Sequence, residues 1–262
     1  MKTRLDAELV RRGLARSREA ATDLIAAGNV LVSGMPASKA ATQVDAETSI
    51  TLKDDHAEFV SRGGHKLAGA LDKFTQIDVS GKTALDAGAS TGGFTDVLLK
   101  RGAKKVVAVD VGYGQLAWEL QKDIRVKILD RVNVRNLTSA QVGEEIDLVV
   151  ADLSFISLKL VLPALISVAK EGADFLVMVK PQFEVGKEKL GAGGVVRDVH
   201  LRKEAVVTVA DSAFALTLGT LGVVASPLPG PSGNVEYFLW LRKGAPALLE
   251  VDLDLAIEKG PA

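Results

Sequence analysis

The chain has 262 residues, of which 47% are hydrophobic and 25% charged, a composition that suits a folded globular protein and disfavours intrinsic disorder. Its 32 basic and 33 acidic residues nearly cancel, so the net charge of −1 indicates no particular partner. The absence of cysteine excludes disulfides, thiolate nucleophiles and cysteine-ligated metals.

Neither the histidines nor the apolar runs indicate a metal site or a membrane segment. The three histidines, at positions 56, 65 and 200, have unrelated spacings, so we expect no metal site. The N-terminus lacks the apolar core of a signal peptide. The most apolar region, residues 146–169, is interrupted by charged side chains, which makes it a poor membrane span. We therefore expect a cytoplasmic protein that does not enter the membrane.

The first block, residues 1–56, is expected to form helices followed by short strands. Leu5 and Leu9 recur at helical spacing, and Ser17 is a suitable N-cap for a second helix. The runs "VLV" and "TSITL" favour strands. Within residues 1–18, six basic side chains accompany only two acidic ones. Taken alone, this excess favours a small helical cap whose arginines are solvated.

The order of features in this block is more specific than its charge. It resembles the S4 RNA-binding domain in Arg4-Leu5-Asp6, Gly13, Ser17-Arg18, Ile25, "GNVLVSG", Lys39 and Ile50. The resemblance implies that basic side chains contact folded RNA, which is read largely through shape and phosphate contacts. The block contains no aromatic residue on which single-stranded bases could stack. The expected RNA-binding residues are Arg4, Arg11, Arg12, Arg16, Arg18, Lys39 and, beyond the block, Arg62.

The second block, residues 62–262, follows an expected linker at 57–61 and alternates between strand and helix patterns. The runs "TALDAG", "KVVAVDV", "VKIL", "DLVVADL" and "FLVMVK" favour strands of a mostly parallel sheet with helices on both faces. The connection between "GVVAS" and "EYFLWLRK" is too short for a parallel crossover, so these runs are expected to form an antiparallel pair. Trp118 is expected to pack in the core.

A glycine-rich loop, "LDAGASTGGF", follows the first of these strands. Gly88, Gly92 and Gly93 would allow a ligand to approach the backbone closely. The loop lacks the Gly-Lys-Ser/Thr of a P-loop and the spacing of a dinucleotide fingerprint, which excludes the former and disfavours the latter.

Acidic residues at the strand ends narrow the choice of ligand. Asp86 could accept from an ammonium group, Asp110 could hold two ribose hydroxyls, and Asp130 could lie near an adenine. An amino acid joined to a nucleoside has all these parts, so the expected cofactor is S-adenosylmethionine. The expected cofactor-binding residues are Asp86, Gly88, Ser90, Thr91, Gly92, Gly93, Phe94, Asp110, Asp130 and Asp152.

Charged residues also stand at the ends of later strands. Asp152 and Lys180 end two apolar runs, and Glu236 opens an antiparallel run that begins where its parallel neighbours finish. Lys66 lies on an expected helix. Each residue alone could be a helix cap, an ion-pair partner or a solvated charge. Three of them at one edge of a sheet favour a shared chemical role.

These four residues resemble the Lys-Asp-Lys-Glu tetrad of 2′-O-ribose methyltransferases of the FtsJ/RrmJ type. The whole chain is similar to the TlyA family, historically labelled hemolysin A, in "VSRGGHKL", "LDAGASTGGFTDVLL", "DVGYGQLAW", "DLVVADLSFISL", "VKPQFEVGK" and "SPLPGPSGNVEYFLWL". The resemblance implies an α/β, Rossmann-like class I methyltransferase with a seven-stranded sheet, preceded by a small α+β S4-type domain. It also implies methylation of cytidine 2′-hydroxyls in 16S ribosomal RNA, 23S ribosomal RNA or both, within ribosomal subunits.

The catalytic residues implied by the resemblance are Lys66, Asp152, Lys180 and Glu236. A ribose hydroxyl is a weak acid, so its attack on a sulfonium methyl benefits from loss of the proton. A lysine becomes a base at neutral pH only where burial and nearby positive charge favour the neutral amine. We expect Lys180 to accept the proton, or at least to position the hydroxyl.

Several alternatives stay open at this stage. The family often has Arg-x-Trp-Val between its domains, whereas this chain has "AEFV" at residues 57–60. Because the arginine is missing, coupling of the two domains through this linker is an open question. The Gly/Pro-rich loops "PLPGPSGN" and "FEVGKEKLGAGGVV" could be connections or RNA-contacting lids. A membrane-lytic protein and a catalytically inactive RNA-binding module are the competing functions.

Overall fold

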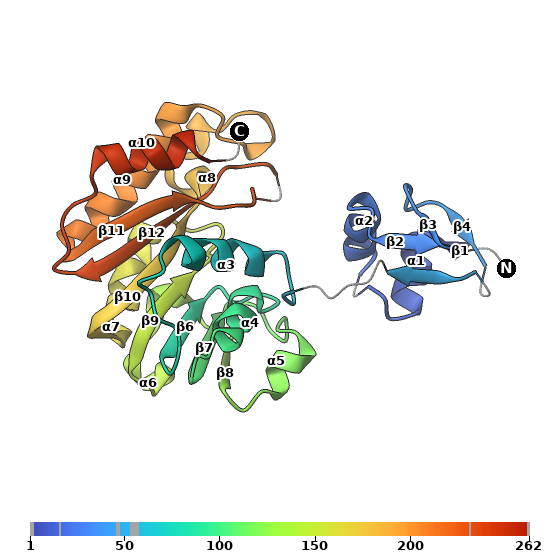
Figure 1. The fold of residues 1–262 in the computed structure, drawn as a ribbon, viewed down its shortest axis with the longest axis horizontal. Coiled ribbons are helices and arrows are strands. Elements are labelled where there is room, and N and C mark those ends of the chain that lie inside the picture. Colours follow the sequence, from blue (N-terminus) through green and yellow to red (C-terminus); the bar gives the residue numbers. More distant parts are fainter. Residues whose placement is uncertain (1–2, 16, 46–47, 53–57, 231, 261–262) are drawn as a thin grey trace. The chain divides into compact units, whose positions relative to one another are not determined.

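The structure, a computed structural model, describes residues 3–15, 17–45, 48–52, 58–230 and 232–260 (Figure 1). The chain divides into two compact units, Met1–Glu58 and Phe59–Ala262, and each is described by itself. The elements of the N-terminal unit are β1 (Thr3–Arg4), α1 (Leu5–Arg11), α2 (Arg18–Ala26), β2 (Val30–Val32), β3 (Met35–Pro36), β4 (Gln43–Val44) and β5 (Ile50–Leu52).

The N-terminal unit is held together by the apolar faces of its two helices. Leu5 and Leu9 on α1 are fully buried, as are Ala21 and Ile25 on α2, because residues four apart lie on one helix face. β2 pairs antiparallel with both β3 and β5, and β1 pairs with β4. The Ser17 side chain accepts a hydrogen bond from the Ala20 amide, which confirms the predicted N-cap of α2.

The C-terminal unit contains the larger sheet. Its elements are α3 (Gly63–Lys73), β6 (Thr83–Ala87), α4 (Gly93–Lys100), β7 (Lys105–Asp110), α5 (Trp118–Lys122), β8 (Val126–Asp130), η1 (Val134–Asn136), α6 (Ser139–Val142), β9 (Ile146–Ala151), η2 (Leu158–Leu160), α7 (Leu162–Val168), β10 (Ala169–Val179), α8 (Pro181–Glu184), η3 (Lys187–Lys189), η4 (Ala192–Gly194), α9 (Val199–Ala215), β11 (Leu218–Ala225), β12 (Tyr237–Lys243) and α10 (Glu250–Glu258).

The seven strands are ordered β11-β12-β10-β9-β6-β7-β8. The five strands from β10 to β8 are parallel, whereas β12 runs antiparallel to both β10 and β11. The predicted mostly parallel sheet and the predicted terminal antiparallel pair are therefore confirmed. Because β12 is reversed, it begins at the edge of the sheet where its parallel neighbour β10 ends.

Helices cover both faces of this sheet (Figure 1), so two apolar cores form. Side chains of α3, α4 and α5 pack on one face, and side chains of α7, α9 and α10 pack on the other. Burial on both faces explains why the central strands read as continuous apolar runs in the sequence.

Trp118 departs from its predicted place in the core. It is the first residue of α5, and 65% of its surface is exposed. The buried side chain of this short helix is Leu120, and Trp118, two positions earlier, faces away from it. The Lys122 ammonium lies 4.0 Å from the centre of the Trp118 ring, as expected for a residue one turn along the helix.

The described residues contain neither a membrane-spanning helix nor a cluster of metal ligands. No helix there combines the length and the apolar character needed to cross a membrane. No group of three or more metal-ligating side chains is arranged around a common point in the same residues.

Candidate active site

The ends of three neighbouring strands bring three of the predicted residues to one edge of the sheet. Asp152 directly follows β9 and Lys180 directly follows β10, while Glu236 directly precedes β12. Val177 of β10 pairs with Ala151, and Val179 pairs with Tyr237. Adjacent strands lie about 5 Å apart, so the three side chains start from neighbouring backbone positions.

Lys180 is enclosed at the end of its apolar strand rather than released into solvent. Its ammonium lies 2.5 Å from Asp152 Oδ1, and only 10% of the side chain is exposed. The same Nζ donates a hydrogen bond to Ser154 Oγ at 3.0 Å. Pro181 then begins α8, and proline at the first helical position is compatible with a sharp strand-to-helix change. The lysine that ends β10 is therefore fixed in direction by two partners.

Lys66 and Glu236 form the second pair. Lys66 on α3 places its Nζ 2.5 Å from Glu236 Oε2, and the two side chains are 6% and 1% exposed. Glu236 Oε1 has no hydrogen-bond partner among the described residues. A Cβ at Gly230 would lie 2.6 Å from this oxygen, so glycine leaves the approach to Glu236 open. This carboxylate therefore retains a free acceptor beside the strand ends.

Such an arrangement is unfavourable for stability alone. Removing charges from water is expensive, and buried ion pairs often stabilise a fold no more than apolar residues of the same volume would. Two lysine–carboxylate pairs at one sheet edge are therefore better explained by chemistry than by folding. Together they offer two ammonium donors and a carboxylate acceptor to a bound hydroxyl.

The glycine-rich loop is shaped chiefly by contacts within the protein. Gly88 has φ +89°, and a Cβ there would lie 2.5 Å from the Asp152 carbonyl oxygen. A Cβ at Gly93 would lie 2.8 Å from the Gly64 amide nitrogen, at the start of α3. These glycines were expected to admit a ligand. The structure shows that both allow the loop to lie directly on β9 and α3, and their contact with a ligand stays a prediction.

Asp86 is fully buried in β6, beneath this loop. Its Oδ2 accepts a hydrogen bond from Thr95 Oγ1 at 2.6 Å, whereas Oδ1 has no partner among the described residues. Burial, opposed by the Thr95 hydrogen bond and assisted by the charge of Asp152, raises the pKa of Asp86 to about 7. A ligand ammonium is the kind of group that would complete the hydrogen bonding of Oδ1 and favour the ionised carboxylate.

The next two strand ends carry Asp110 and Asp130. Asp110 accepts from the Ser90 amide at 2.8 Å and from the Gly112 amide at 2.7 Å, so it joins the glycine-rich loop to the loop after β7. Asp130 accepts from the Gly114 amide at 2.9 Å. Both side chains stay half-buried, and each carboxylate oxygen retains a second lone pair for a ribose hydroxyl or an adenine amino group. These hydrogen-bond acceptors fit the ribose hydroxyls and the adenine of S-adenosylmethionine.

An exposed aromatic pair at the same edge escaped the sequence analysis. Phe155, three residues after Asp152, is 90% exposed and has φ +63°, an unfavourable conformation for a bulky residue. Its ring centre lies 5.1 Å from that of Phe183 on α8, three residues after Lys180. The sequence does contain a signal for this pair. Phe155 stands in the loop directly after the strand that ends at Asp152, and a loop side chain at that position is often exposed.

The predicted RNA-binding arginines of the N-terminal unit are organised by two buried carboxylates. Asp6 pairs with Arg4 at 3.0 Å and with Arg18 at 2.9 Å. The Arg4 hydrogen bond, aided by Arg18, lowers the pKa of Asp6.

Glu8 plays the same part for the other two described arginines. It pairs with Arg11 at 2.6 Å and with Arg12 at 2.7 Å, and Arg12 also donates to the backbone carbonyls of Asp45 and Thr48. The hydrogen bonds from Arg11 and Arg12 lower the pKa of Glu8 to about 2. Arg11 remains mostly exposed, whereas the guanidinium of Arg12 donates its hydrogen bonds to groups within the N-terminal unit.

The remaining predicted RNA contacts have varied surroundings. Arg16 lies outside the described residues. Lys39 is exposed in the N-terminal unit. Arg62 is exposed at the start of α3 and donates to the Pro229 carbonyl at 2.5 Å, which ties the helix to the loop before Glu236.

The segment that departs from the family linker is anchored at its second half, while Ala57 lies outside the described residues. Phe59 is buried and meets the His65 ring edge-on, with centres 5.1 Å apart. A Cβ at Gly64 would lie only 2.5 Å from Phe59 Cγ, so the aromatic ring packs directly on the start of α3. The Val60 amide donates to Asp96 on α4 at 2.9 Å. This segment therefore contacts the helices that flank the glycine-rich loop.

Comparison with known proteins agrees with the division into two units. Residues 59–243 match the family of FtsJ-like methyltransferases, and residues 3–50 match the S4 domain. The sequence is 57% identical to the 16S/23S rRNA (cytidine-2′-O)-methyltransferase TlyA of Mycobacterium tuberculosis, over 99% of both chains.

Two further relatives extend the comparison. The chain is 42% identical to YqxC of Bacillus subtilis, named as a candidate rRNA methyltransferase, over 92% of this chain and 86% of that one. The solved structure of a candidate hemolysin from Streptococcus thermophilus has a TM-score of 0.80 and 36% identity, over 98% of this chain and 95% of that chain. The full-length agreement places both units of the fold, and the seven-stranded sheet, within one family.

Proposed function

The chain belongs to the TlyA family, in which an S4 domain precedes an FtsJ-like methyltransferase domain, and on this premise we propose that it methylates the 2′-hydroxyl of cytidine in ribosomal RNA. The substrates we propose are the RNAs of the small and large ribosomal subunits, within the assembled subunits. The methyl donor we propose is S-adenosylmethionine, and the place of action is the cytoplasm, where ribosomes are found.

The observation that carries this proposal is the pairing at the sheet edge. The Lys180–Asp152 pair lies at the ends of β10 and β9, and the Lys66–Glu236 pair joins α3 to the start of the neighbouring strand β12, beside the glycine-rich loop. A ribose hydroxyl placed there would meet an amine, a carboxylate acceptor and a methyl donor at once. Holding reactants in this way converts a bimolecular reaction into an effectively unimolecular one.

The residues that would hold the cofactor are those of the three loops after β6, β7 and β8. We assign Asp86 to the ammonium group, Asp110 to the ribose hydroxyls and Asp130 to the adenine. Each carboxylate has an oxygen lone pair available, and their strands β6, β7 and β8 are neighbours in the same order as these three parts of the cofactor. When bound, S-adenosylmethionine supplies a methyl group on a sulfonium centre.

Lys180 is assigned to the 2′-hydroxyl itself. Its contacts with Asp152 and Ser154 fix the Nζ beside the end of β9, where it would position the hydroxyl and take up its proton while the methyl carbon leaves the sulfonium sulfur for the hydroxyl oxygen. Asp152 orients this amine. Glu236 Oε1, which has no partner among the described residues, accepts a hydrogen bond from the substrate, and Lys66 holds Glu236 in position.

Phe155 is assigned to the target nucleotide. A ribose in a structured RNA reaches an enclosed amine most easily when its nucleotide leaves the base stack, and the unstacked base then needs an apolar surface. The exposed Phe155 ring, held by Phe183 three residues beyond Lys180, offers that surface beside the reacting group. The basic S4 residues supply phosphate contacts, which position RNA without reading its sequence.

The decisive experiment is methyl transfer from labelled S-adenosylmethionine to purified small and large ribosomal subunits, followed by mapping of ribose methylation. We expect cytidine 2′-O-methylation, and we expect Lys180→Ala to lower the rate by about 10²–10⁴, the usual contribution of a general base. Lys180→Arg separates the two roles of the lysine. Arginine keeps the positive charge but does not deprotonate, so it is expected to be nearly as inactive as alanine.

Calorimetry with S-adenosylmethionine serves as the control for these variants, since both should bind the cofactor as the unaltered chain does. Turnover within a few fold of normal in Lys180→Ala would remove the lysine from the reaction. The competing membrane-lytic function predicts dye leakage from lipid vesicles, whereas our proposal predicts none. The third possibility, an inactive RNA-binding module, predicts RNA binding with no heat of cofactor binding.

A further inference from the structure

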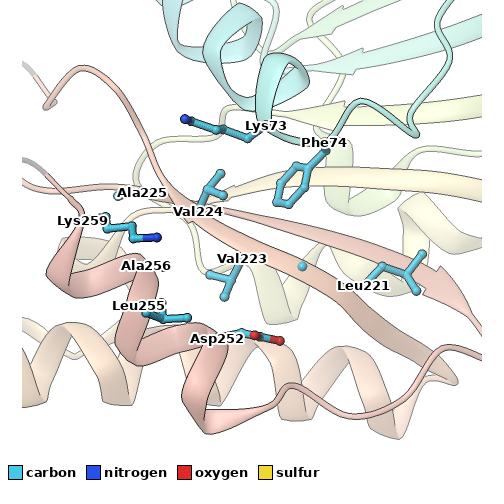
Figure 2. A pocket seen from close by; sticks show the side chains of 11 residues that line it. Lys73, Phe74, Leu221, Val223, Val224, Ala225, Asp252, Leu255, Ala256 and Lys259 are labelled. Atoms are coloured by element: carbon cyan, nitrogen blue, oxygen red, sulfur yellow. The ribbon is translucent and has the colours of Figure 1, made fainter.

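A groove runs along the outer strand of the sheet, away from the residues assigned to methyl transfer. It has a volume of about 460 Å³ and is bounded by β11, α10 and the last turn of α3 (Figure 2). Its apolar lining includes Phe74, Val223 and Ala256, all buried, with Leu255 on the rim. Five consecutive residues of β11, from 221 to 225, line it.

The groove begins at the point on the outer edge of β11 where the segment that follows β12 no longer covers this strand. The Thr220 amide donates to the Pro246 carbonyl at 2.7 Å, so the segment after β12 closes the first half of the strand edge. A register shift follows between Thr220 and Gly222. The Ser226 amide donates inward to Glu236, so alternation along an antiparallel strand directs the backbone groups of Val223 and Ala225 outward. This half of the edge can therefore pair with another strand.

Charges mark the two ends of the groove. Lys73 and Lys259 lie toward the Ala225 end of β11, and Asp252 lies toward the Leu221 end (Figure 2). None of these three side chains forms an ion pair within the part of the chain that the structure describes. By contrast Asp254, on the same helix, pairs with Lys203 of α9. The groove thus carries positive charge at one end, negative charge at the other and apolar surface between.

When two copies of this groove face each other in opposite directions, the positive end of each meets the negative end of the other. We propose that the groove is the interface of a symmetric dimer, in which the β11 edges of two copies of this chain pair antiparallel. A two-fold axis through such a pair sets every residue i of one copy against residue j of the other, and j against i. Asp252 of each copy then faces the partner's Lys259, and Leu255, which is 43% exposed, meets its own counterpart near the axis. The pairing would also cover the open half of the strand edge.

The charge order allows a test that does not depend on any one variant folding perfectly. Sedimentation velocity of the full chain over a range of concentrations is expected to show a monomer–dimer equilibrium. Asp252→Lys places lysine against the partner's Lys259, and Lys259→Asp places aspartate against the partner's Asp252. Each is expected to weaken dimerisation about tenfold, because two symmetry-related pairs change from attraction to repulsion.

Mixing the two single variants supplies the decisive arm. In a mixed dimer every altered residue faces an opposite charge, so the mixture is expected to dimerise as tightly as the unaltered chain. Asp254→Lys is the matched control, with the same change of charge on the same helix facing α9, and is expected to leave the dimer unchanged. A chain that is monomeric at all concentrations overturns the proposal, as does a dimer that the mixed variants fail to restore. If the chain is strictly monomeric and the groove instead binds an extended acidic peptide or an amphiphile, the dimer proposal is likewise overturned.

Discussion

Lys66 Nζ and Glu236 Oε2 lie 2.5 Å apart although 170 positions separate them in the sequence. The contact joins the first helix of the C-terminal unit to the start of its last strand, and almost none of either side chain reaches water. Because Gly93 lies directly against the start of α3, the same helix contacts the glycine-rich loop and carries one member of the candidate tetrad. α3 is thus the element through which the two halves of the site are aligned.

The first prediction concerns this pair. Lys66→Met leaves the Glu236 carboxylate buried without its partner, and we expect a loss of roughly 3–5 kcal/mol in the free energy of unfolding of the C-terminal unit. Lys66→Met combined with Glu236→Gln removes both charges and is expected to regain most of that loss. Urea unfolding of the single and double variants measures the coupling.

Methyl transfer distinguishes a structural from a functional pair. We expect the double variant to be stable and inactive, because its neutral residues neither hold nor orient the hydroxyl. Losses in unfolding free energy that simply add in the double variant would show that the two residues are not coupled. A stable double variant with full turnover would confine the pair to folding.

The second prediction is the pH dependence of cofactor binding. The pKa of Asp86 is raised by burial to about 7, so the carboxyl is neutral below that pH and ionised above it. An ammonium group binds the ionised form better, and we expect the affinity for S-adenosylmethionine to rise as the pH passes from 6 to 8. Asp86→Asn keeps an acceptor for Thr95 Oγ1, and is expected to bind weakly with little dependence on pH over this range. Calorimetry at a series of pH values measures both.

Stability without cofactor should change in the opposite sense. The folded state keeps the Asp86 proton up to a pH near 7, whereas the unfolded chain loses it near its ordinary value of 3.8. The stabilising contribution is therefore complete below the unfolded value and is lost as the pH rises through about 7. The measurement is the thermal midpoint of the C-terminal unit at a series of pH values, for the unaltered chain and for Asp86→Asn. A midpoint that falls less steeply with rising pH in Asp86→Asn supports this expectation, and identical slopes contradict it.

The strand-end residues could be predicted from the sequence because they follow from topology alone. Parallel strands finish at one edge, so a lysine after β10 and an aspartate after β9 had to be near neighbours. Reversal of the last strand added Glu236. Which lysine pairs with which carboxylate depends on where α3 packs, and no local pattern specifies that contact.

Other features were beyond local patterns for equally physical reasons. Trp118 and Phe155 are large apolar residues that are exposed, and burial of a single residue depends on its rotation about a helix or loop that the sequence does not define. Charge counting treated the N-terminal arginines as equivalent, although Asp6 and Glu8 are themselves buried and divide the arginines between them.

The third prediction separates these arginines. Arg12 donates to Glu8 and to two carbonyls of the strand region, so Arg12→Ala is expected to lower the thermal midpoint of the N-terminal unit. Arg11 is mostly exposed, and Arg11→Ala is expected to weaken RNA binding with little change in stability. The measurement is binding to ribosomal RNA over a range of salt concentrations, where loss of one phosphate contact lowers the salt slope by about one. An unchanged slope for Arg11→Ala would mean that this arginine does not contact phosphate.

The last prediction concerns Phe155. Stacking of a base on an aromatic ring contributes roughly 1–3 kcal/mol, so Phe155→Ala is expected to lower kcat/KM for ribosomal subunits by about 5- to 150-fold. Its ring is 90% exposed, so the stability should change little, and relief of the strained backbone makes Phe155→Gly a still milder change for the fold.

Two comparisons make this result specific. Phe155→Trp retains an aromatic face and is expected to keep most of the activity, whereas Phe155→Leu retains apolar volume without that face and is expected to lose it. Phe214→Ala removes another exposed ring, 49% exposed on α9 away from the sheet edge, and should leave turnover unchanged. Cofactor affinity should be the same in all of these proteins. Equal activity of the leucine and tryptophan variants would show that Phe155 contributes bulk rather than a stacking surface, and the assignment to the target base would fail.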